Sequence, residues 1–248
     1  MSTIWTVLLL SLLPGVGNFL GGMVAEAREP SPRLLNWSLH AASGIVVAIV
    51  AVELMPNALD DLAGWWVALA FSLGGLAYVV VETVVGRLQR KQDSGDRSRM
   101  WMIYAAVAVD LTSDGLMIGS GAAVSSSLAL ILAAGQVLAD APEGYATMAN
   151  FRAEGISRPK RLLLSLSFFI YVVGSAVGSY FLLRDAPNEM KMAGLVFVAG
   201  LLTVAAVEDM LEEAHEAYDD SRRSVLAFIG GFALFTLVSA GVGEVAGR

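Results

Sequence analysis

Residues 162–183 read LLLSLSFFIYVVGSAVGSYFLL, a stretch without a single charged side chain. A helix needs roughly 20 mostly apolar residues to cross the hydrocarbon core of a bilayer, and this stretch is long enough to do so. It is too long and too uniformly apolar for a barrel strand, which alternates between lipid and lumen over roughly ten residues. It therefore predicts a transmembrane helix, which satisfies its own backbone hydrogen bonds in lipid.

Seven further stretches have the same character. The eight predicted spans are residues 4–25, 35–58, 65–85, 101–123, 126–146, 162–183, 193–210 and 225–242. The first lacks a preceding basic segment and is too long for the apolar core of a signal peptide, so it is interpreted as a span. The sequence thus predicts an all-α fold, a polytopic membrane bundle of about eight transmembrane helices that forms one domain over residues 1–248.

The composition agrees with a membrane environment. Of the 248 residues, 56% are hydrophobic and 16% are charged, and the mean hydropathy is +0.66, whereas soluble domains carry about 25% charged residues. The chain has no cysteine, which excludes disulfides and thiolate metal sites. The net charge of -7 argues against nucleic acid as a partner. The lipid bilayer is the expected surrounding, and a homodimer is left open.

Basic residues predict the orientation of the bundle. The loops after the first, third, fifth and seventh spans hold 13 of the 16 Lys and Arg residues. Since cytoplasmic loops carry an excess of basic residues, both termini are expected outside the cytoplasm of a cell inner (plasma) membrane. The loop at about residues 88–99 is then cytoplasmic.

Small residues recur inside the spans, as at Gly74-Gly75, Gly174, Gly178 and Gly230-Gly231. Small side chains let helix backbones approach one another in a membrane. These positions are therefore expected to lie at helix contacts.

The fourth span contains carboxylates at a depth where they are costly, and intramembrane carboxylates mark functional sites. It reads Val109-Asp110-Leu111-Thr112-Ser113-Asp114-Gly115. Asp110 and Asp114 are four residues apart and share a helix face. A divalent cation or a shared proton would relieve their mutual repulsion. Ser113 is able to bond back to the helix backbone.

The fifth span ends Ala139-Asp140-Ala141-Pro142-Glu143-Gly144, and its two acids are three residues apart on one face. Pro142 lacks an N–H and is expected to kink the helix. A short turn at Gly119-Ser120-Gly121 makes spans four and five antiparallel neighbours. The four carboxylates are then expected to converge on one oxygen-rich cavity, which a hard or borderline divalent cation requires. The alternative places Asp140 and Glu143 in the headgroup region as solvated charges.

Further acids lie near the ends of spans two and seven. Glu53 is expected near the outer end of span two, where it either attracts cations or extends to the surface. Glu208, Glu212 and His215 share a face by their spacing. They form either a cytoplasmic exit path for a cation or a solvated helix end. His40 stands alone in span two and is interpreted as a packing or interfacial residue.

These stretches resemble the ZIP (Zrt/Irt-like) family of divalent-metal transporters, which has eight spans, outward termini and a variable cytoplasmic loop between spans three and four. The family carries His-Asn-x-Pro-Glu-Gly where this chain reads DLTSDG at residues 110–115, and His-Glu-x-Pro-Glu where it reads ADAPE at residues 139–143. Both signature histidines are therefore replaced, by Asp110 and Ala139.

The resemblance implies a metal site of carboxylates that holds one ion rather than two. Asp114 and Glu143 match by position, and Asp140 and the substituted Asp110 complete the set. Such oxygen ligands suit Mn²⁺ or Fe²⁺, while Zn²⁺ more often uses nitrogen or sulfur and remains compatible through carboxylates and water.

The leading hypothesis is a non-enzymatic permease that moves Mn²⁺, Fe²⁺ or Zn²⁺ into the cytoplasm through a site between spans four and five. Glu53 would attract the ion, and Glu208 and Glu212 would release it. No ATP-binding motif is present, so the drive would come from ion gradients or proton exchange. Because metal ligands must lose their protons, uptake should weaken at low pH.

Three alternatives remain open. The acids could relay protons in a carrier of another solute. Asp110 and Asp140 could form the catalytic pair of an aspartyl intramembrane protease, although the Gly-x-Gly-Asp stretch of those enzymes is absent. The chain could also be a degenerate relative that transports no metal.

Overall fold

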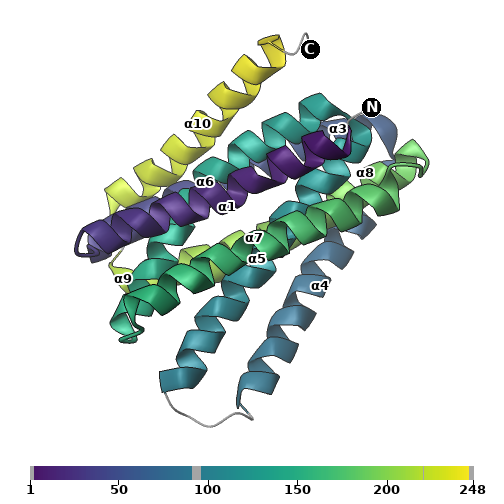
Figure 1. Ribbon diagram of the computed structural model, residues 1–248. Coiled ribbons are helices and arrows are strands. Elements are labelled where there is room, and N and C mark those ends of the chain that lie inside the picture. The colour runs from purple at the N-terminus through teal and green to yellow at the C-terminus, as the bar shows by residue number, and fades with distance from the viewer. Residues whose placement is uncertain (1–2, 91–95, 220, 246–248) are drawn as a thin grey trace.

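The computed structural model describes residues 3–90, 96–219 and 221–245, and every regular element in these ranges is a helix (Figure 1). The predicted all-α fold is confirmed. The α-helices and the two π-helices (η) are α1 (Ile4–Ala27), α2 (Pro32–Ala48), η1 (Ile49–Leu54), α3 (Met55–Asp61), α4 (Gly64–Arg90), α5 (Asp96–Val124), α6 (Ser126–Ala153), α7 (Arg158–Leu183), α8 (Asn188–Ala205), η2 (Ala206–Met210), α9 (Leu211–Ala217) and α10 (Arg222–Val245).

The eight predicted spans correspond to eight long helical segments. Among the described residues, seven segments are long and apolar enough to cross a membrane, including α2–η1–α3 and α8–η2–α9, each as one unit. The eighth, α6, is as long as these but carries more polar residues, and it packs against α1, α5 and α2. Because α6 is enclosed by other helices, it does not need an apolar surface all round. The chain is a multi-pass membrane protein.

The connection between α5 and α6 differs from the predicted turn. Gly119 and Gly121 lie within α5, and Ser125 alone separates the two helices. The Ser125 hydroxyl caps α6 by accepting a hydrogen bond from the Leu128 N–H at 3.0 Å. So short a connection makes α5 and α6 neighbours, as predicted. The predicted loop at 88–99 is also shorter than expected, because its two ends continue α4 and α5, while residues 91–95 lie outside the described residues.

Small residues at helix contacts are confirmed for some of the predicted positions. A Cβ at Gly74 would lie 1.8 Å from the carbonyl oxygen of Phe197, and a Cβ at Gly231 would lie 2.0 Å from that of Ala41. These glycines allow α4 to pack on α8 and α10 on α2. Gly174, Gly178 and Gly230 are different, since no described atom lies within 4 Å of a Cβ built there. They face away from the described part of this chain, and the prediction of packing within the chain is wrong for them.

The helices form two sets by their main contacts. One set contains α1, α5, α6 and α7, and the other pairs α2 with α10 and α4 with α8. In Figure 1, α10 and α4 lie at opposite edges of the view with the first set between them. An apolar core that includes Ile49, Met117, Leu132 and Phe235 joins the two sets. The acidic residues of α5 and α6 lie about one helical turn from this core.

Candidate metal site

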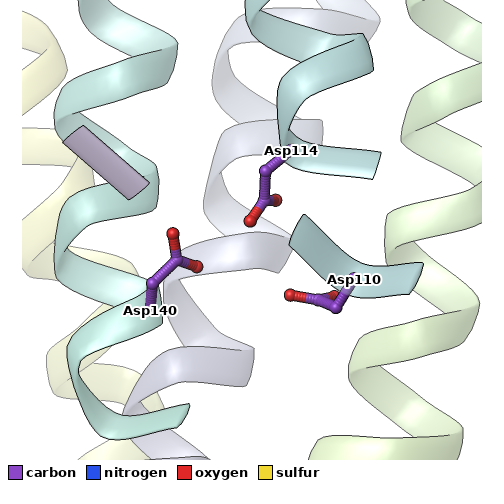
Figure 2. A group of neighbouring side chains, drawn as sticks. All are labelled: Asp110, Asp114 and Asp140. Carbon is purple, nitrogen blue, oxygen red and sulfur yellow. The ribbon is translucent and has the colours of Figure 1, made fainter. Parts of the chain in front are cut away.

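Three carboxylates meet where α5 crosses α6. Asp110 and Asp114 on α5 point toward Asp140 on α6 (Figure 2), and one carboxylate oxygen of each lies within 4.8 Å of those of the others. Asp114 and Asp140 are 0% exposed and Asp110 is 7% exposed. Asp140 is therefore not a solvated surface charge, which was the alternative interpretation. The structure brings together three of the four acids expected to converge.

Glu143 adjoins this group from one turn further along α6. Its side chain and that of Asp110 both line one acidic cavity. An ionised carboxylate only accepts hydrogen bonds. Carboxyl groups gathered this closely therefore favour a shared proton or a cation between them.

Four carboxylate oxygens of the group lack a protein partner. Asp114 Oδ2, Glu143 Oε2 and both oxygens of Asp140 are buried without a hydrogen-bond partner among the described residues. Asp114 Oδ1, in contrast, accepts a hydrogen bond from the Gln136 side-chain amide. Burying an unpaired charge is costly, and buried charges are normally paired or coordinate a metal. This oxygen-only, anionic arrangement has the chemistry of a divalent-cation site.

A strongly acidic cavity of about 300 Å³ adjoins the three aspartates. Seven carboxylates and no basic side chain stand among its described lining residues, and the seven are Asp110, Glu143, Glu208, Asp209, Glu212, Glu213 and Glu216. Asp110 belongs to both the cavity and the cluster. The cavity lies toward the end of the bundle where α5 begins and α6 and α9 end, which the orientation prediction assigns to the cytoplasm. Such a surface concentrates cations next to the cluster.

The acids of the seventh span that reach the cavity form one helical stripe. Glu208 and Glu212 line the cavity, and so do Asp209 and Glu213, which the predicted face did not include. Their one- and four-residue spacings place all four on one side of the segment, so the face that lines the cavity is wider than the predicted one. His215 is not among the lining residues. Its ring packs edge-on against His40 with the centroids 5.6 Å apart, so His40 does not stand alone.

Glu53 lies elsewhere. It is 7% exposed within η1 and accepts a hydrogen bond from the Ser239 hydroxyl of α10. It belongs neither to the three-carboxylate cluster nor to the lining of the acidic cavity. The interpretation that it extends to the surface is wrong, and a fixed partner on α10 fits helix packing better than an exposed entrance.

The residues after the acids hold α5 and α6 against their neighbours. A Cβ at Gly115 would lie 2.2 Å from the Val172 carbonyl oxygen of α7, and a Cβ at Gly144 would lie 1.8 Å from the Asn18 carbonyl oxygen of α1. These glycines were not predicted to contact neighbouring helices, although an acid followed by glycine in both spans was the available signal.

Two predicted features of the helix backbone have different outcomes. The expected back-bond of Ser113 is confirmed, since its hydroxyl donates to the Val109 carbonyl at 2.9 Å. Pro142 lies inside α6, which runs on to Ala153, and the kink expected there stays a prediction.

Comparison with known proteins supports the family resemblance. No family model matches the chain. The zinc transporter ZupT of Chlorobaculum parvum is 24% identical to it over 93% of both chains. The zinc transporter ZupT of Escherichia fergusonii is 25% identical, over 95% of this chain and 98% of that protein. Over nearly its whole length the chain is therefore similar to proteins of the ZIP family. It departs from the family signatures where Asp110 and Ala139 stand in place of the two histidines.

Proposed function

We propose that this protein is a divergent member of the ZIP family that carries a divalent metal ion across the membrane, and that the ion binds between Asp110, Asp114 and Asp140 with Glu143 beside them. The observation that carries the proposal is the pair of Asp140 oxygens, which are both buried, have no hydrogen-bond partner in the described part of the chain, and face the carboxylates of α5. The relatives named as zinc transporters support a divalent metal as the substrate.

The acidic cavity gives the ion a path of exchangeable ligands. Asp110 lies at the boundary between the cluster and the cavity, so an ion leaving the cluster meets Asp110 and Glu143 first. Beyond them, carboxylates of η2 and α9 such as Glu208 and Glu212 replace the lost ligands. Each transfer exchanges one oxygen for another, which keeps the ion coordinated while water gains access. Release on this side corresponds to inward transport in the predicted orientation.

The other side of the cluster is apolar. Met117 follows Asp114 on α5 and Leu132 precedes Gln136 on α6, and both are 0% exposed within the core that contains Phe235. A hydrated ion does not cross such a layer while the helices stay in place. Transport therefore requires one set of helices to move relative to the other, as alternating access demands. The set that contains both acidic helices is α1, α5, α6 and α7.

The metal specificity follows from the ligand atoms. The acids of the cluster offer only oxygen, which suits Mn²⁺ and Fe²⁺. Zn²⁺ is bound through carboxylates and water in the same site. The three ions therefore belong together in any transport assay.

Uptake by the purified protein in proteoliposomes tests the proposal. Mn²⁺, Fe²⁺ and Zn²⁺ are supplied separately to the wild type, to Asp140→Asn and to Asp60→Asn. Asp60 is exposed and lies outside the acidic cavity, so the same chemical change there serves as a matched control. We expect saturable uptake of at least one ion by the wild type and the control, and its loss in Asp140→Asn. Equal uptake by all three proteins would rule out the proposed site. Solute uptake that needs no metal would instead indicate a proton-coupled carrier.

A further inference from the structure

Gln136 is a buried amide beside the aspartates. It lies one helical turn before Asp140 on the same face of α6 and is 1% exposed. The Gln136 Nε2 group donates a hydrogen bond to Asp114 Oδ1, which links α6 to α5. The Gln136 Oε1 atom is buried and has no hydrogen-bond partner among the described residues.

The chemistry of the two groups fixes the direction of this amide. An ionised carboxylate accepts hydrogen bonds but cannot donate them, so the NH₂ group of Gln136 must face Asp114. The nitrogen and oxygen belong to one planar amide, so Oε1 is buried on the same group that contacts Asp114. A buried carbonyl oxygen is normally satisfied by a donor or a cation. None of the described residues donates to it, and the carboxylates of the neighbouring cluster attract a cation.

We propose that Gln136 is a fourth member of the metal site, with two roles. Its N–H holds Asp114 Oδ1 and leaves Oδ2 for the ion, and its carbonyl oxygen is a neutral ligand. This inference rests on the proposed function. Side-chain amide oxygens are common ligands of hard cations. The Gln136 carbonyl adds a metal ligand without adding negative charge to three carboxylates that already repel one another.

The position of Gln136 makes it a determinant of which metal is preferred. The family signature matched in this span begins at Ala139, so Gln136 lies outside it. Ala139 stands where the family has an imidazole, and a methyl group supplies no ligand. With Gln136 the donor set consists of three carboxylates and one amide oxygen, which favours Mn²⁺ relative to Zn²⁺. An imidazole at position 136 would move the preference toward Zn²⁺.

Three variants separate these roles in uptake competition between Mn²⁺ and Zn²⁺. Gln136→Leu removes both the N–H and the carbonyl, and we expect at least a tenfold weaker apparent affinity for Mn²⁺, the range typical of lost ligand support. Gln136→His adds a nitrogen donor and should raise the preference for Zn²⁺ over Mn²⁺ about tenfold. The isosteric Gln136→Glu keeps an oxygen in place and should keep the wild-type preference. If Gln136→Leu does not fold, Gln136→Glu is compared with Gln136→His instead.

The ratio of the two affinities is the decisive reading, since a purely structural role would change uptake of both metals alike. A wild type that transports metal, with a ratio and affinity that none of the three variants alters, would overturn the role of Gln136 and leave the proposed function intact. A folded wild type that takes up neither metal would overturn both.

Discussion

Removing one carboxylate from the cluster should stabilise the metal-free protein. At 4.8 Å, the separation within which the carboxylate oxygens of Asp110, Asp114 and Asp140 lie, two unit charges repel by about 3.5 kcal/mol at an effective dielectric constant of about 20. Protons bound by the carboxyls in place of the ion reduce this figure. Asp140→Asn therefore raises the free energy of unfolding in the presence of a chelator by up to about 3 kcal/mol, whereas most substitutions of buried groups lower it.

Bound metal should reverse the order of stability, so that the wild type becomes more stable than Asp140→Asn. An ion that binds only the folded wild type at about 100 times its dissociation constant adds about 2.7 kcal/mol of stability. For a chain of this size that corresponds to an increase in Tm of about 5 to 10 °C. Asp140→Asn should show little or no increase, because the ion loses a ligand with two unpartnered oxygens.

Thermal unfolding followed by tryptophan fluorescence measures both effects, since the chain contains five tryptophans. The exposed Asp60→Asn variant is the control and should behave like the wild type with and without Mn²⁺ or Zn²⁺. A Tm for Asp140→Asn below that of the wild type in chelator, together with an equal metal-induced increase in both proteins, would refute the reasoning.

Three further predictions concern packing and protonation. Gly144→Leu should destabilise the protein by about 1–3 kcal/mol or more through overpacking against the Asn18 carbonyl, whereas Gly174→Leu should be tolerated, and Tm values for the pair check this. Asn36→Leu should lower the free energy of unfolding by about 1–3 kcal/mol for each hydrogen bond lost, because the Asn36 amide donates to two carbonyls at the end of α9, at 2.9 and 3.0 Å. The exposed Asn188→Leu is the matched control, and equal Tm values for the two variants would contradict this role of Asn36. Metal affinity should fall as the pH is lowered, by up to about tenfold per pH unit for each displaced proton, and equal Mn²⁺ affinities at pH 5.5 and 7.5 would mean that protons do not compete for the site.

Much of the architecture could be predicted from the apolar runs. Stretches such as residues 162–183 have the length and composition that only a membrane-spanning helix accommodates, and the four-residue spacing of Asp110 and Asp114 places both on one helix face. The very short connection before α6 then brings Asp140 opposite them. These inferences depend on local periodicity, which the sequence records directly.

The remaining features depend on departures from that periodicity or on tertiary contacts. The face of the seventh span that lines the cavity is wider than the predicted one and is centred differently, so Asp209 and Glu213 were missed and His215 was misplaced. Small residues look alike whether they contact a helix or face outward, as Gly74 and Gly178 show. Gln136 stands in an apolar run, and only the fold reveals that it meets Asp114.

Crystals of the protein soaked in Mn²⁺, measured for anomalous scattering at the manganese edge, would test the proposed site most directly. The arrangement of the carboxylates predicts an anomalous peak between Asp110, Asp114 and Asp140, within coordination distance of at least one oxygen of each. A peak found only among the acids of α9, such as Glu212 and Glu216, would contradict the central claim, as would the absence of any peak at a concentration that supports uptake.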